Sequence, residues 1–149
     1  DYQDHHIIFT YSNSDTNSQI IIKRIQEYVD KNQGRCMFIP SLGQRRYFSA
    51  LKYMTAVIGN SSSGIIEVPS FGIPTLDIGD RQKGRIAADS VIHCGYSKEE
   101  IREGLKMVVA YGHKIIDNPY YKEGTCDAIL KVIKTYPLEK LVQKHFYDT

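Results

Sequence analysis

A run of small polar residues, GNSSSG at positions 59–64, is the first part of this sequence that could do chemistry. It follows a short apolar run and precedes a brief helical pattern, so it joins a predicted strand to a predicted helix. Small side chains let a ligand's oxygens approach the backbone, where free N–H groups and the helix dipole favour an anion. The hydroxyls of Ser61, Ser62 and Ser63 add donors, and Gly64 closes the turn. We expect this serine loop to bind phosphate; the alternative is that a serine only caps the helix.

A carboxylate follows the serine loop. Glu67 lies three residues past the end of the loop, one turn into the predicted helix. It could accept hydrogen bonds from ribose hydroxyls, the task that an acidic residue performs in dinucleotide-binding folds. The alternative is a glutamate in the first helical turn, where the helix dipole favours a negative charge. Taken alone, this residue does not decide between the two interpretations.

Residues 79–85, GDRQKGR, form a second polar segment, the basic loop. Arg81, Lys83 and Arg85 stand between glycines directly after another predicted strand. Guanidinium groups bind phosphate through two parallel hydrogen bonds, which suits a diphosphate. A solvated surface loop is the alternative explanation of such a charge run. The carboxyl ends of parallel strands share one sheet edge, so we expect the basic loop beside the serine loop, which favours phosphate binding.

Short apolar runs alternate with helical patterns along the whole chain. Strands are predicted at 6–11, 36–39, 56–59, 75–78 and 90–93. Helices are predicted at 18–31, 45–54, 64–71, 98–111, 125–135 and 138–146. Strands this short and apolar, each separated by a helix, are typical of a parallel sheet buried on both faces. We therefore predict a single α/β domain with a Rossmann-like, doubly wound sheet and ligands at the carboxyl ends of its strands.

Composition excludes several classes of function. A chain of 149 residues with 42% hydrophobic and 24% charged residues is an ordinary soluble domain. A net charge of +2 is too small to predict a nucleic acid or an anionic membrane as partner. No apolar run has the length of a membrane span and no signal peptide is present, so we expect a cytoplasmic protein. The start at Asp1, without Met, is typical of a piece of a longer protein or of a processed terminus.

Metal and redox chemistry find no support in the sequence. The three cysteines are far apart, form no C-x-x-C pair, and are expected to be free thiols: Cys36, Cys94 and Cys126. The histidines lack partner spacing and are expected to be structural: His5, His6, His93, His113 and His145. We predict neither a metal nor a cofactor.

Three segments resemble one known family. Residues 41–44 (SLGQ), 56–68 (AVIGNSSSGIIEV) and 79–85 (GDRQKGR) resemble the C-terminal domain of hydrolysing UDP-N-acetylglucosamine 2-epimerases of bacterial sialic-acid and related pathways. Order and spacing both match, and the resemblance covers essentially the whole chain. It implies the two-domain GT-B architecture, of which this chain would be the C-terminal half. Its partners would be UDP or a UDP-sugar and the protein's own N-terminal domain, and a homo-oligomer is compatible with the sequence.

The resemblance also implies roles for individual residues. In that family the serine–glycine turn binds the diphosphate and the following glutamate binds the ribose. The stretch 41–47 would lie near the uracil. The implied UDP-binding residues are Gly43 or Tyr47 for uracil, Ser61, Ser62, Ser63 and Gly64 for diphosphate, Glu67 for ribose, and Arg81, Gln82 or Arg85 on the phosphate side.

The segment after the first predicted strand separates two branches of the family. Non-hydrolysing relatives carry a histidine there, whereas this chain has YSNSD at residues 11–15. The hydrolysing branch has a YPNAD-like run, so Ser12 and Ser14 are departures from its pattern. The segment favours the hydrolysing branch, and Asn13 and Asp15 become candidates for the phosphate or sugar side.

The implied reaction has two steps. UDP leaves C1 as a base removes the C2 proton, and water then adds to the resulting 2-acetamidoglucal, which gives N-acetylmannosamine. In the family the acid and base groups come mostly from the N-terminal domain, so the catalytic residues are unknown here and this half alone is expected to be inactive. Two alternatives stay open: the C-terminal domain of another GT-B glycosyltransferase, and a nucleotide-binding module without chemistry.

Overall fold

The computed structural model describes residues 2–11 and 18–137. The chain divides into two compact units, Asp1–Met54 and Thr55–Thr149, each with its own set of contacts. The predicted helix at 138–146 and the segment 12–17 lie outside the described residues. That the whole chain forms a single domain stays a prediction.

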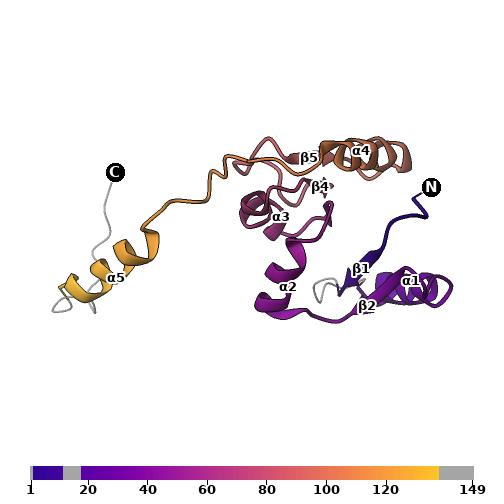
Figure 1. Cartoon of the computed structure of the whole chain (residues 1–149), viewed down its shortest axis with the longest axis horizontal. Coiled ribbons are helices and arrows are strands. Elements are labelled where there is room, and N and C mark those ends of the chain that lie inside the picture. The colour runs from indigo at the N-terminus through magenta and orange to yellow at the C-terminus, as the bar shows by residue number, and fades with distance from the viewer. Residues whose placement is uncertain (1, 12–17, 138–149) are drawn as a thin grey trace, which may run out of the picture. The chain divides into compact units, whose positions relative to one another are not determined.

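The first unit contains two strands and two helices. Strand β1 (Ile7–Thr10) pairs in parallel with β2 (Cys36–Ile39), with Ile7 opposite Cys36. Helix α1 (Ser18–Asp30) connects them and packs beside β2 (Figure 1). Helix α2 (Gly43–Leu51) follows, and its last residue, Leu51, is fully buried. The unit is therefore a β-α-β crossover followed by one more helix.

The second unit is built on a three-stranded parallel sheet in the order β3-β4-β5. Its strands are β3 (Val57–Gly59), β4 (Thr75–Ile78) and β5 (Val91–Cys94). Gly59, Asp77 and His93 stand opposite one another across the three strands. Since β4 lies between two neighbours, its first three residues are buried, and they form the centre of this unit.

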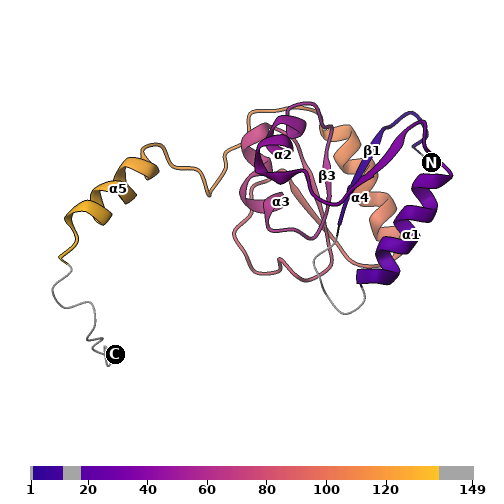
Figure 2. The same cartoon turned by 90° about the horizontal axis from the view of Figure 1, so that it is seen from below.

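Helices cover both faces of this sheet. Thr75 donates from its hydroxyl to the carbonyl of Gly64 in α3 (Ser63–Ile66) over 2.7 Å. The next residue, Leu76, points to the other face, where a Cβ on Gly104 of α4 (Lys98–Tyr111) would overlap it. Figure 2 shows β3 between α3 and α4. The predicted α/β class, with parallel strands flanked by helices, is confirmed.

One predicted helix is wrong in its continuity. Residues 64–71 form two pieces, α3 and the 3-10 helix η1 (Val68–Phe71), which meet at Glu67. Pro69 lacks the N–H that a continuous α-helix would use, and in such a helix its ring would clash with the carbonyl four residues before it. The break changes the surroundings of Glu67, as described below.

The last described helix, α5 (Thr125–Thr135), has no buried residue. Among its apolar residues, Ile129, Leu130 and Ile133 are 49–66% exposed. No described helix, in 2–11 or 18–137, has both the length and the apolar content to cross a bilayer.

Candidate functional site

The serine loop lies where the sequence predicts it, between the carboxyl end of β3 and the start of α3. Ser61 and Ser62 are exposed and Ser63 is half-buried. Ser62 stands at the cap position of α3, but its side chain makes no capping hydrogen bond. The Ser61 hydroxyl instead accepts from the Ser63 N–H over 3.4 Å. Capping of α3 thus does not account for the Ser62 hydroxyl.

Some backbone N–H groups of the serine loop are used within the loop, and others have no acceptor among the described residues. Gly64 and Ile65 donate their N–H groups to the carbonyls of Ser61 and Ser62, at 3.1 and 3.0 Å. The N–H groups of Ser61 and Ser62 have no acceptor within 2–11 and 18–137. A Cβ on Gly64 would lie 2.6 Å from Thr75 Cγ2, so this glycine allows α3 to pack on β4. The first turn of the loop therefore has two N–H donors available for a ligand, and Gly64 lets the start of α3 pack closely on β4.

Glu67 is a half-buried carboxylate at the junction of α3 and η1. It ends α3 and at the same time stands at the cap position of η1, where its side chain makes no capping hydrogen bond. Its Oε2 atom is buried and has no hydrogen-bond partner within the described residues. A buried acceptor left unpaired costs about 1–3 kcal/mol. Glu67 therefore holds an acceptor that a ligand hydroxyl could satisfy.

Gln82 joins the basic loop to the serine loop. Only 3% of its surface is exposed, and its Nε2 donates to the Asn60 carbonyl over 2.7 Å. A carbonyl only accepts, so the amide nitrogen must face Asn60 and Oε1 must face away. That Oε1 is also buried without a partner among the described residues. The expected proximity of the two loops is thus met through Gln82.

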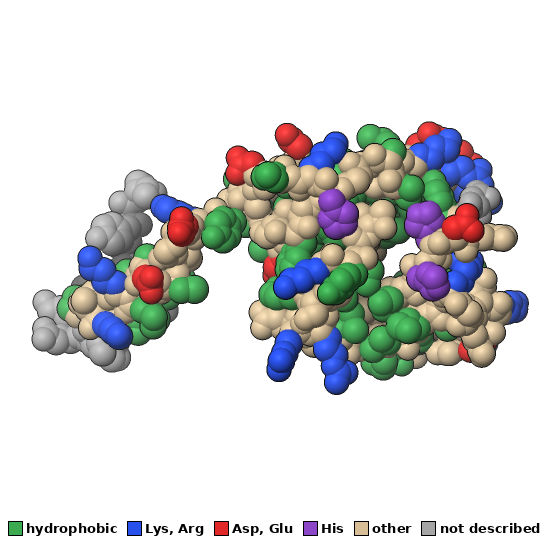
Figure 3. Space-filling model, in the orientation of Figure 1, with side chains coloured by type: hydrophobic (Ala, Val, Ile, Leu, Met, Phe, Trp, Pro, Cys, Tyr) green, Lys and Arg blue, Asp and Glu red, His purple; other side chains and the backbone are tan. Residues whose placement is uncertain are grey.

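Arg81, Lys83 and Arg85 are exposed around this buried residue. Two turns bend the loop, with N–H groups of Lys83 and Arg85 donating to the carbonyls of Asp80 and Gln82 at 3.1 and 3.2 Å. The loop is therefore a folded turn with its centre anchored and its cations outside. On the face shown in Figure 3, the described basic and acidic side chains are interspersed instead of forming one basic field.

Sequence reasoning missed a contact between a buried aspartate and an exposed histidine. Asp77 is 1% exposed, and its Oδ2 lies 2.8 Å from Nδ1 of His93, whose side chain is 49% exposed. The signal was available: each polar residue is third in a short apolar strand, and the strands pair in register. Burial raises the pKa of the neighbouring Cys94 thiol, and the Glu100 and Asp77 carboxylates add to the shift. His93, which the sequence analysis expects to be structural, thus has Asp77 as its hydrogen-bond partner.

The residues predicted near uracil belong to the other unit. Gly43 begins α2, and its N–H donates to the Ser41 hydroxyl over 3.2 Å. Tyr47 is half-buried, with its ring 5.8 Å from that of Phe48. Their uracil role stays a prediction. Asn13 and Asp15 lie outside the described residues.

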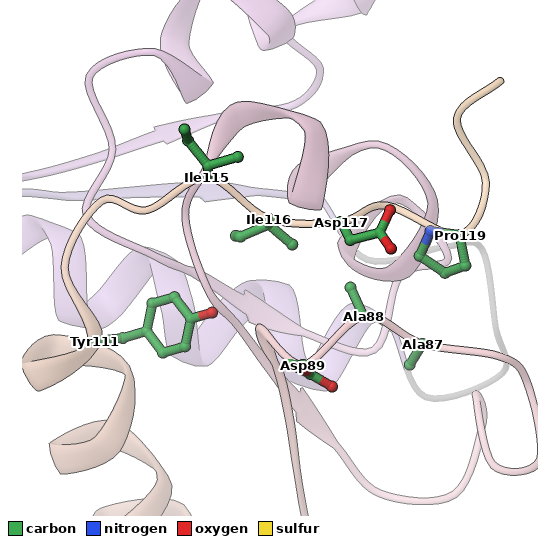
Figure 4. A pocket seen from close by; sticks show the side chains of 8 residues that line it. All are labelled: Ala87, Ala88, Asp89, Tyr111, Ile115, Ile116, Asp117 and Pro119. Atoms are coloured by element: carbon green, nitrogen blue, oxygen red, sulfur yellow. The ribbon is translucent and has the colours of Figure 1, made fainter. Parts of the chain in front are cut away.

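A cavity of about 280 Å³ lies elsewhere in the second unit (Figure 4). Its lining includes Asp89, Tyr111 and Asp117, with the Tyr111 hydroxyl pointing into it. Asp89 precedes β5, so the cavity is at the amino edge of the sheet, whereas the serine loop follows the carboxyl end of β3. The cavity is separate from the candidate site. Residues 2–11 and 18–137 hold no group of three His, Cys, Asp or Glu side chains placed for a metal ion.

Residues 1–134 match the family of UDP-N-acetylglucosamine 2-epimerases. The chain belongs to this family. The two joined loops and Glu67 lie within the residues that match this family.

Individual relatives support the same assignment. The chain is 37% identical to polysialic acid biosynthesis protein P7 of Escherichia coli, over 97% of this chain and 38% of the relative. It is 44% identical to GDP/UDP-N,N'-diacetylbacillosamine 2-epimerase (hydrolyzing) of Campylobacter jejuni, over 58% and 22%. It is 32% identical to UDP-N,N'-diacetylbacillosamine 2-epimerase (hydrolyzing) of Legionella pneumophila, over 91% and 36%. The chain thus spans less than two fifths of the length of these relatives.

Proposed function

We propose that this chain is the C-terminal, UDP-binding half of a hydrolysing UDP-N-acetylglucosamine 2-epimerase. The observation that carries the proposal is the buried Oε2 atom of Glu67, which has no partner among the described residues. It lies three residues past a loop whose Ser61 and Ser62 N–H groups also lack an acceptor there. A nucleoside diphosphate offers the matching groups, because its phosphates accept hydrogen bonds and its ribose hydroxyls donate them.

The diphosphate is assigned to the serine loop and the basic loop. The N–H groups of Ser61 and Ser62 donate to phosphate oxygens, as backbone donors do at helix N-termini elsewhere. The exposed guanidiniums of Arg81 and Arg85 add charge-assisted hydrogen bonds. Gln82 keeps the two loops together, so donors from both loops can bind the same ligand.

In the reaction, this half stabilises the leaving group. As the C1–O bond breaks, negative charge grows on the departing UDP, and donors already in place lower the barrier. A base removes the C2 proton as UDP departs, which leaves a glucal intermediate. Water then adds across its double bond and gives the free 2-epimer. We assign the acid and base groups to an N-terminal domain of the same protein, and we expect this half alone to be inactive.

Mass spectrometry of the products of the full-length protein tests the proposal. UDP-N-acetylglucosamine and UDP-N,N'-diacetylbacillosamine are both offered in H₂¹⁸O, since two relatives are named for the second sugar. Hydrolysing epimerisation predicts UDP without ¹⁸O and a free 2-epimer carrying ¹⁸O at C1. Sugar transferred to an added acceptor identifies a glycosyltransferase, and no turnover of either substrate supports a binding module; both outcomes contradict the proposal.

A further inference from the structure

The basic loop begins at Gly79, directly after β4, and its first residue lies against the ring of Tyr96. Tyr96 belongs to the segment that connects β5 to α4. Gly79 has a φ of +84°, a conformation that other residues adopt at a cost. A Cβ on Gly79 would overlap the ring of Tyr96. The absence of a side chain therefore serves both the turn and the close approach of the Tyr96 ring.

Two hydrogen bonds fix this start of the loop. The Gly79 N–H donates to the Cys94 carbonyl over 2.8 Å, which extends the pairing of β4 and β5 by one step. The Asp80 N–H donates to the Tyr96 hydroxyl over 3.1 Å. The residue directly before Arg81 is therefore held by a side chain outside the loop.

The residue after Tyr96, Ser97, is the N-cap of α4. Ser97 Oγ accepts from the Glu100 N–H at 3.2 Å, and the Glu100 carboxylate accepts from the Ser97 N–H at 3.1 Å. This reciprocal capping box fixes the backbone where the helix begins. The backbone next to Tyr96 is thus held by the start of α4.

The Tyr96 side chain is 71% exposed, so it adds little to the core of the unit. We propose that Tyr96 is a positioning residue that holds the first half of the basic loop in its phosphate-binding conformation. Tyr96 fixes the loop at Asp80 and Gln82 fixes it at its centre, with Arg81 between the two anchors. The guanidinium then starts from a restrained backbone, which lowers the conformational entropy lost when the diphosphate binds.

The proposal rests on the proposed function, and two measurements on the full-length protein test it. The first compares UDP and uridine affinity of wild type and Tyr96→Phe, which keeps the ring and loses the hydroxyl. We expect UDP to bind about two- to tenfold more weakly, the range for one hydrogen bond, with uridine unchanged. Tyr121→Phe is the control, since that ring is 70% exposed and its hydroxyl has no partner within residues 2–11 and 18–137.

The second measurement reads the order of the loop without a ligand. Trypsin cleaves after Arg81, Lys83 and Arg85, and a loop released at Asp80 exposes these bonds more often. Tyr96→Phe should be cut faster within residues 81–86 than wild type or Tyr121→Phe, with an unchanged melting temperature. Because this readout needs no nucleotide, it tests Tyr96 even if the protein fails to bind UDP.

Unchanged UDP affinity together with unchanged loop cleavage would overturn the proposal. Equal losses for UDP and uridine, or a lowered melting temperature, would also overturn it, because they show a general structural role. If wild type itself does not bind UDP while the cleavage difference persists, the proposed function fails and the anchoring of the loop by Tyr96 stands.

Discussion

The amide nitrogen of Gln82 donates to the carbonyl of Asn60 over 2.7 Å, and this contact joins the basic loop to the serine loop. Both residues come from segments that follow neighbouring parallel strands, and Gln82 is nearly fully buried. The cations of one loop and the backbone donors of the other are thereby held at one edge of the sheet. Binding of the diphosphate by both loops depends on this contact.

Glu67 is expected to control nucleotide affinity more than stability. Glu67→Gln keeps the shape and removes the charge, so the hydrogen bonds from ribose weaken by about 1.5–3 kcal/mol. Titration calorimetry should show weaker UDP binding, with a nearly unchanged melting temperature because the unpaired Oε2 loses no protein partner. A lower melting temperature with unaltered UDP affinity would instead assign Glu67 a structural role.

The basic loop should distinguish arginine from lysine. Arg85→Lys and Arg81→Lys keep the charge and lose the planar fork, so UDP should bind more weakly and uridine equally well. In the full-length enzyme, the same changes should slow turnover, because charge on the leaving group grows in the transition state. Lys83→Arg is the matched control. Equivalence of Lys and Arg at all three positions, with only a salt-screened effect, would make the loop a solvated surface.

Much of this arrangement could be predicted from the sequence. The alternation of short apolar runs with helical patterns predicted the parallel strands, and small residues after a strand located the serine loop. The break at Glu67 depends on Pro69, whose missing N–H interrupts an otherwise helical pattern. Gln82 looked like one polar residue among charges, since no local pattern says that an amide is buried against a distant carbonyl. The Asp77–His93 contact needed the register of β4 and β5, which a single strand does not encode.

The Asp77–His93 pair should contribute to folding and leave nucleotide binding alone. His93→Ala leaves a 1% exposed carboxylate without this partner, which costs about 1–3 kcal/mol. Chemical denaturation should therefore show a lower free energy of unfolding, whereas His113→Ala, at an exposed position, should have little effect. The double variant with Asp77→Asn should be less destabilised than the sum of the single changes. Additive losses would show that the pair is not coupled.

Glu100 predicts a specific response to acid. Its hydrogen bonds with the Ser97 hydroxyl and N–H lower the pKa of this carboxyl from its ordinary value of 4.5. A lowered folded-state pKa stabilises the fold above the unfolded-state pKa, and this contribution is lost as the pH falls through the folded-state value. As the pH falls below about 5, where carboxyl groups titrate, the Glu100→Gln variant should therefore lose less stability than wild type. Parallel melting-temperature profiles of the two proteins in acid would contradict this.

We propose that this chain binds UDP through its phosphates without a metal ion. Titration calorimetry of the full-length protein with UDP and with uridine, each with EDTA and with Mg²⁺, tests this. We expect UDP to bind in EDTA and much more tightly than uridine, because the serine and basic loops contact only the diphosphate. Equal affinity for the two ligands, or UDP binding only with Mg²⁺, would contradict it.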